Sequence, residues 1–152
     1  MEQRADPSKV IISNRGFTGD GFVDWVKEGR LKLTDRRAIG PKQKSDLWDC
    51  HFLSCVVAGV SPGTVVIDMR TEPYKVLDGN ARIGAIVDFL NGDTLRHPNS
   101  DMDQLSLWEF GGLGERVILR RLREASFSLV CIMPGTGDLE AERIAQFLLP
   151  WH

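Results

Sequence analysis

One stretch, residues 74–90, constrains the fold more than any other part of the chain. Residues 74–77 alternate along the chain and are rich in β-formers, which predicts a short strand. The dipeptide Asp78-Gly79 then signals a tight turn. Apolar residues follow at the helical spacing i, i+3, i+4 and i+7, namely Ile83, Ile86, Val87 and Leu90. Because Asn91-Gly92 is a stop signal, the stretch predicts a strand, a turn and a helix in direct succession.

A helix that begins directly after a glycine turn is suited to binding an anion. The first N–H groups of a helix have no partner within the helix, and the helix dipole adds positive potential there. Gly79 lets an anion approach the backbone, and Arg82 carries a planar guanidinium suited to phosphate. The residues therefore predict a phosphate site formed by Gly79, Asn80, Ala81 and Arg82. A plain turn before a helix is the alternative.

The length and composition indicate a soluble globular protein. With 152 residues, 42% of them hydrophobic and 26% charged, we expect a single domain over residues 1–152. The net charge of −2 gives no overall attraction to nucleic acid or to an anionic membrane. No apolar run approaches the ~20 residues that span a bilayer, so we expect no membrane partner.

The N-terminus and the cysteines favour a cytoplasmic protein. Residues 1–8 are polar, lack the apolar core of a secretory signal and are expected to be poorly ordered. The odd set Cys50, Cys55 and Cys131 indicates free thiols in a reducing compartment. Cys50 and Cys55 lack the usual zinc spacing, so we interpret them as small buried hydrophobic residues and predict no resident metal.

The other patterns predict a mixture of strands and helices without regular βαβ alternation. We expect further strands at residues 9–13, 30–33, 64–67 and 127–133. We expect further helices at residues 22–29, 46–58, 113–124 and 139–149. Residues 14–21 carry three glycines and are predicted to form a loop. The fold class is therefore α+β.

Several of these segments resemble one known family. The sequence Val76-Leu77-Asp78-Gly79-x-x-Arg82 before an apolar helix resembles the Asp-Gly-Gln-Gln-Arg box of the GmrSD-type restriction family, a branch of the ParB/sulfiredoxin-like superfamily. Residues 30–37 resemble the family's strand that ends in an aromatic-Gln-Arg box, and residues 45–68 resemble its helix, Gly-x-Pro link and second strand. The likeness covers roughly residues 25–92 and implies a ParB-like fold, a small mixed sheet flanked by helices.

The resemblance implies a nucleotide pocket with two arms, the Asp-Gly box and the Asp35-Arg36-Arg37 segment. Arg37 matches the family's arginine and is carried over as a phosphate ligand. Arg36 replaces the family's glutamine and Asp35 its aromatic residue. The extra charge of Arg36 either tightens a phosphate contact or indicates that the original contact is lost. The alternative is that the segment is a solvated charge cluster.

The ligand implied by the resemblance is a nucleoside triphosphate with Mg²⁺, whose hydrolysis gates a nuclease partner or an appended domain in phage defence. Asp78 and Asp35 are the carboxylates available to Mg²⁺. Asp78 and Asn80 are the candidate catalytic residues, since an amide can orient an attacking water. The family's two glutamines are replaced by Asn80 and Ala81, and losing a positioned polar group costs ~10²–10³ in rate. We therefore expect nucleotide binding with weak or lost hydrolysis.

Two other functions remain open. The chain can be a non-enzymatic interaction module that keeps the fold without a working pocket. It can also bind DNA through Arg116, Arg120 and Arg123, which share one face of a predicted helix, although ion pairing on a solvated face is the simpler interpretation. No nuclease active site is predicted, because the sequence holds no suitable cluster around its histidines, which are His51, His97 and His152.

Overall fold

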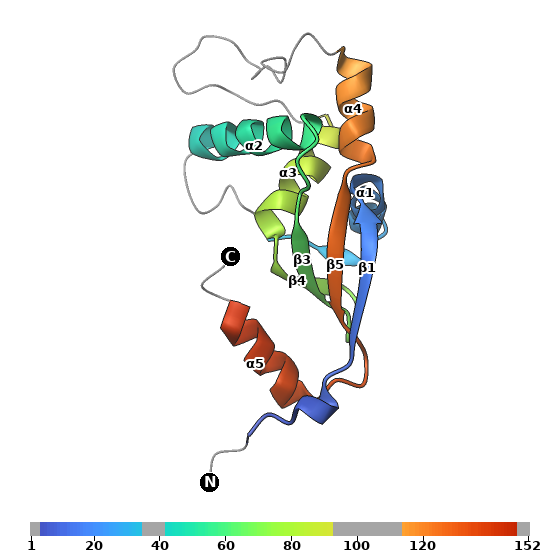
Figure 1. The fold of residues 1–152 in the computed structure, drawn as a ribbon, viewed down its shortest axis with the longest axis vertical. Helices are drawn as coiled ribbons and strands as arrows, with labels where there is room; N and C mark the ends of the chain where they lie inside the picture. Colours follow the sequence, from blue (N-terminus) through green and yellow to red (C-terminus); the bar gives the residue numbers. More distant parts are fainter. Residues whose placement is uncertain (1–3, 35–41, 93–113, 149–152) are drawn as a thin grey trace.

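The computed structural model describes residues 4–34, 42–92 and 114–148 (Figure 1). The strands in these ranges are β1 (Ile12–Thr18), β2 (Leu31–Lys32), β3 (Thr64–Asp68), β4 (Tyr74–Asp78) and β5 (Ser126–Ile132). The helices are α1 (Gly19–Lys27), α2 (Lys42–Val57), α3 (Asn80–Leu90), α4 (Glu115–Arg123) and α5 (Asp138–Leu148), with a 3-10 turn at Pro7–Lys9. This confirms the α+β class, and the predicted strand, turn and helix over residues 74–90 are present.

The five described strands form one mixed sheet in the order β1-β5-β3-β4-β2. Strand β5 pairs antiparallel with β1 and parallel with β3. Strand β4 pairs antiparallel with β3 and parallel with the short β2. The last two strands before α3 are therefore a hairpin, and the end of β2 lies beside β4, which leads directly into α3.

The hydrophobic core lies between one face of the sheet and the helices. The buried residues Phe127 and Leu129 of β5 alternate with the exposed Ser126 and Ser128, as period-2 geometry requires. The ring of Phe127 meets that of Phe22 from α1 edge to face, with centroids 5.0 Å apart. Helix α3 adds its apolar stripe, which comprises Ile83, Ile86 and Val87, to the same core. The sequence periodicity therefore identified the core face of α3 correctly.

Helix α5 lies near the opposite end of the sheet from α2 and α4, beside the N-terminal segment (Figure 1). Arg70 bridges the sheet and this helix, since its guanidinium donates to Asp68 at 2.9 Å and to Asp138 at 2.8 Å. The backbone N–H of Gly137 donates to the carbonyl of Lys9 at 3.0 Å. These contacts fix the start of α5 against the end of β3 and the 3-10 turn that precedes β1.

The prediction of a loop over residues 14–21 is wrong, because residues 12–18 form β1 and α1 begins at Gly19. The strand predicted at residues 9–13 overlaps only the first two residues of β1. The rest was missed because β1 pairs with one neighbour only and is largely exposed, so its sequence lacks an apolar alternation. Gly19 reads as a loop residue in sequence, yet it is buried, and a side chain there would collide with the carbonyl of Leu122. Close packing of α1 against the end of α4 explains this glycine.

Two other boundaries differ from the prediction. Helix α2 begins at Lys42, four residues before the predicted start at residue 46, and it ends at Val57, one residue before the predicted end. The 3-10 turn at Pro7–Lys9 falls within a segment that we expected to be poorly ordered, and Asp6 caps it by accepting from the N–H of Ser8 at 3.0 Å. Local capping therefore orders part of that segment. Within the described residues, no helix is long and apolar enough to cross a membrane.

Candidate functional site

The junction between β4 and α3 has the geometry that the sequence predicts. Asp78 ends the strand, Gly79 adopts a left-handed conformation with φ +105°, and Asn80 begins the helix. A side chain at Gly79 would also collide with the side chain of Val65. The turn therefore requires glycine for two reasons, a positive φ and a close approach to β3.

The first turn of α3 presents backbone donors. The helical hydrogen bonds begin with the N–H of Ile83, which donates to the carbonyl of Gly79 at 3.0 Å. Among the described residues, the N–H groups of Asn80, Ala81 and Arg82 have no hydrogen-bond acceptor. Ala81 is exposed at this position. The start of α3 therefore offers neighbouring N–H donors and the positive end of the helix dipole.

The guanidinium of Arg82 binds the link between α2 and β3. Its Nη1 donates to the carbonyl of Pro62 and its Nη2 to the carbonyl of Thr64, both at 2.9 Å. The carboxylate of Asp78 lies 3.7 Å from Nη2. A side chain at Gly63, which has φ +89°, would meet this guanidinium. Arg82 therefore holds the entry to β3 in place, and its side chain is only 25% exposed.

The side-chain amide of Asn80 binds the backbone of Thr34, directly after β2. Its Oδ1 accepts from the N–H of Thr34 at 2.9 Å, and its Nδ2 donates to the carbonyl of the same residue at 3.1 Å. We call this pair of hydrogen bonds the Asn80–Thr34 clasp. It imitates one step of strand pairing and fixes the end of β2 beside the start of α3.

The structure brings five of the predicted site residues together at the start of α3. Asp78, Gly79, Asn80, Ala81 and Arg82 form one continuous junction. The remaining predicted residues, Asp35, Arg36 and Arg37, lie outside the described residues. They follow Thr34 directly in the sequence, so their chain leaves from a point that Asn80 holds at the helix start.

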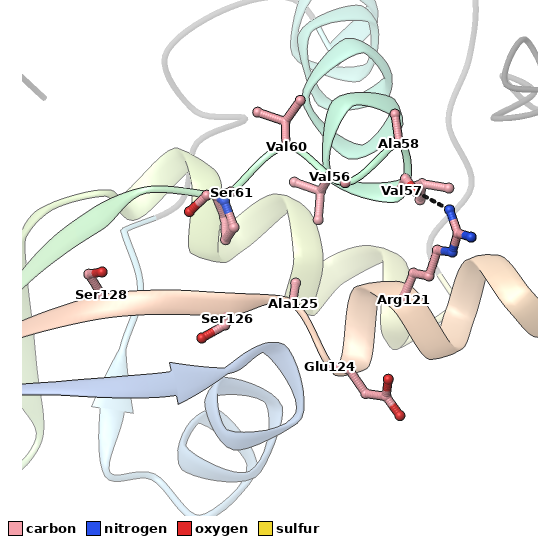
Figure 2. A pocket seen from close by; sticks show the side chains of 12 residues that line it. Val56, Val57, Ala58, Val60, Ser61, Arg121, Glu124, Ala125, Ser126 and Ser128 are labelled. Carbon is pink, nitrogen blue, oxygen red and sulfur yellow. Dashed lines mark hydrogen bonds between the residues drawn. The ribbon is translucent and has the colours of Figure 1, made fainter.

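An open pocket of about 770 Å³ lies beside the same link. Figure 2 shows it between the end of α2, the link that follows and the junction of α4 with β5. Its polar lining includes the hydroxyl groups of Ser61, Ser126 and Ser128. Pro62 also lines it, and the carbonyl of Pro62 is an acceptor for Arg82. The link between α2 and β3 therefore contacts both the pocket and the start of α3. The sequence patterns did not predict this pocket.

The predicted basic face of α4 is exposed at Arg116, Arg120 and Arg123. Arg121 has a different role, because its Nη1 donates to the carbonyl of Val57 at 2.7 Å at the end of α2 (Figure 2). Three of these arginines lie in the last turn of α4, where positive charge complements the helix dipole. The position of the arginines on α4 therefore has a structural explanation that needs no DNA.

None of the three cysteines forms a disulfide, and Cys50 and Cys131 are buried as predicted. Cys55 is exposed, so its interpretation as a buried hydrophobic residue is wrong, and it lies on the outward side of α2. Burial raises the pKa of the Cys131 thiol, although the neighbouring Arg15 acts in the opposite direction. The raised pKa disfavours a reactive thiolate. No group of three or more metal-ligating side chains occurs in the described part of the chain.

Phe147 lies near the end of α5 with 74% of its surface exposed. No protein-family model, curated protein or solved structure matches this chain.

Proposed function

We propose that this chain is a regulatory domain that binds the phosphates of a nucleoside triphosphate, with Mg²⁺, at the start of α3. The proposal extends the resemblance to GmrSD-type restriction proteins and the ParB-like fold. The observation that carries it is the Asn80–Thr34 clasp, because it holds Thr34, which precedes Arg36 and Arg37 in the sequence, beside the N–H groups of Asn80 and Ala81, which bind no acceptor in the described part of the chain. Backbone donors and neighbouring guanidinium groups together form a typical phosphate site.

The contacts of Arg82 change its proposed role. Its two terminal nitrogens donate to backbone carbonyl groups. Arg82 is therefore proposed to supply positive potential and to position the link between α2 and β3, and not to bind phosphate directly through its guanidinium. Arg37, with Arg36, is then the proposed side-chain ligand of the phosphates. Asp78 faces Arg82 at 3.7 Å and, with Asp35, is a carboxylate that Mg²⁺ can use.

Hydrolysis is proposed to be weak or lost, because no amide in the junction is available to orient water. The Oδ1 and Nδ2 atoms of Asn80 are both engaged by Thr34, and Ala81 has no polar group. A phosphate-release assay with Mg²⁺ and purified chain tests this point. Turnover that Asn80→Ala abolishes would contradict the positioning role and restore Asn80 as a catalytic residue.

A sharper test of binding uses Ala81→Glu. The added carboxylate lies in the first turn of α3, where it is favourable to the helix, but it repels a phosphate at the same N–H groups. The matched control is Gln146→Glu, which adds the same charge at an exposed position of α5. Thermal shift and calorimetry with ATP, GTP and their non-hydrolysable analogues should show saturable binding to wild type and the control, and none to Ala81→Glu.

The side chains of Asn80 and Arg82 are both hydrogen-bonded to backbone groups of the protein. This favours a second candidate function, a non-enzymatic interaction module that binds no nucleotide. If no nucleotide at millimolar concentration stabilises wild type, or if Ala81→Glu binds as well as the control, this second candidate replaces the first. Arg37→Ala tests the contribution of the Asp35-Arg36-Arg37 segment apart from that of the start of α3. It should weaken nucleotide binding and leave the unfolding free energy of the nucleotide-free protein unchanged.

A further inference from the structure

Strand β1 is the longest exposed edge of the sheet in the described part of the chain. All seven of its residues pair with β5, and no described strand pairs with its other side. Figure 1 shows β1 at the margin of the sheet, with α1 following from its end. The opposite edge, β2, has only two residues. An interaction that extends this sheet would therefore occur at β1.

The register determines which backbone groups face outward. The N–H of Met133 donates to the carbonyl of Ile11, and the N–H of Gly19 donates to the carbonyl of Ala125. Hydrogen-bonded pairs alternate along an antiparallel ladder, so the odd-numbered residues of β1 face β5. The N–H and C=O groups of Ile12, Asn14 and Gly16 therefore point away from the sheet, and no described residue binds them.

This edge has only one of the usual protections against pairing, a single charged side chain. The strand contains no proline, and its register with β5 runs without a bulge. It is exposed at both Asn14 and Gly16, which leaves room for a neighbouring backbone. Its one charged residue is Arg15, which is also exposed. Edge strands of this kind accept an extended segment as an added strand.

Arg15 decides what kind of segment fits. Its guanidinium lies 5.6 Å from the ring centroid of Phe17 and 5.5 Å from that of Trp25, so it lies on the same face of the sheet as these two aromatic side chains. No carboxylate of the described residues forms an ion pair with it. A segment with an acidic residue opposite Arg15 gains a cross-strand ion pair. An apolar residue two positions away would lie over Phe17, which is partly exposed.

A second copy of the chain is a poorer occupant. Outward-facing residues must pair with outward-facing residues, so the most extensive antiparallel self-pairings place Asn14 opposite Gly16 or opposite Asn14. The first puts Arg15 opposite Arg15, and the second puts Arg15 opposite Ser13, so that the two arginines are diagonal neighbours two pair positions apart. Like charges directly opposite each other destabilise a strand pair, and the diagonal arrangement gains no ion pair, whereas an acidic segment turns the same charge into an attraction.

We propose that the β1 edge is a docking site for an extended acidic segment of a partner protein, which adds a sixth strand beside Ile12, Asn14 and Gly16 and pairs a carboxylate with Arg15. This interaction is independent of the nucleotide site, since none of its residues belongs to the β4–α3 junction. It gives the chain a way to recruit another protein that needs no bound ligand.

The experiment selects binders to the whole purified chain from a displayed library of random linear peptides. Enriched peptides should carry Asp or Glu with an apolar residue two positions away, and they should bind as free synthetic peptides in a fluorescence polarisation assay. Asn14→Pro removes an outward N–H without touching the β5 ladder, because proline is tolerated where an edge N–H faces solvent. It should weaken binding about tenfold, while Asn14→Thr, which keeps the N–H, changes it by less than about twofold.

Charge exchange tests the role of Arg15. Arg15→Glu should weaken the acidic peptides about fivefold and favour their Lys counterparts, a reversal that general loss of structure does not produce. If Asn14→Pro fails to fold, Ile12→Pro blocks the same edge at its other end. The proposal is overturned if no peptide is enriched, or if the enriched peptides bind the proline variants as tightly as wild type. It is also overturned if wild type sediments as a dimer that Asn14→Pro dissociates, because a second copy then occupies the edge.

Discussion

Replacing Arg82 with alanine should lower the unfolding free energy by about 2 kcal/mol, because this side chain joins the start of α3 to the entry of β3. It donates to the carbonyls of Pro62 and Thr64 at 2.9 Å each. A hydrogen bond from a charged donor contributes about 1.5–3 kcal/mol when it is shielded from water. The side chain is 25% exposed, so water replaces part of the lost interaction. The pair with Asp78 at 3.7 Å adds little to this total.

Chemical denaturation monitored by tryptophan fluorescence measures this loss, and a thermal melt should show a decrease of roughly 6 °C. Arg82→Lys keeps the charge but lacks the fork that reaches both carbonyls, so it should recover only about half of the stability. The matched control is Arg116→Ala, which removes an exposed arginine from α4 and should change the free energy by less than about 0.5 kcal/mol. If Arg82→Ala is as stable as this control, the guanidinium does not hold the link, and Arg82 is available to a ligand.

Two further predictions test the surrounding contacts. Asn80→Ala should remove both hydrogen bonds to Thr34, lower the unfolding free energy by about 1 kcal/mol and speed amide exchange at the Thr34 N–H, whereas unchanged exchange would show that the clasp does not form in solution. Burial raises the pKa of the Asp68 carboxyl, but hydrogen bonds from Arg70 outweigh burial and hold the pKa below its ordinary value. Asp68 therefore stabilises the fold above about pH 4, and this stabilisation is lost as the pH falls through the pKa of the folded state. Stability measured across the acidic range should therefore fall less steeply in Asp68→Asn than in wild type, and identical profiles would contradict this assignment.

The sequence predicted those elements whose signals are local. The turn at Asp78-Gly79, the apolar stripe of α3 and the β-branched run of β3 are all read from neighbouring residues, and all are present. The prediction was wrong for most of β1, which is an exposed edge strand, and for Cys55, which lies on the outward side of α2. In both places the decisive property is burial, which depends on residues far away in the chain.

The junction predicted at the start of α3 is present, but the sequence did not indicate what its side chains bind. Its residues at the start of α3 are contiguous, so local reasoning located the N–H donors correctly. What the side chains of Asn80 and Arg82 bind was not visible, because their partners are 46 and about 20 residues away, at Thr34 and at Pro62 and Thr64. The polarity of the two side chains suggested a ligand, whereas backbone groups of the protein take up their hydrogen bonds.

The amino-acid sequence by itself determined that a strand, a left-handed glycine and an amphipathic helix follow one another over residues 74–90, because periodicity and turn chemistry act between neighbours. Only the tertiary structure decided that β5 lies between β1 and β3, that β2 ends beside the start of α3, and that β1 remains an open edge. The physical reason is that strand order and side-chain partners depend on how all the apolar faces are buried together, and this is a property of the whole chain.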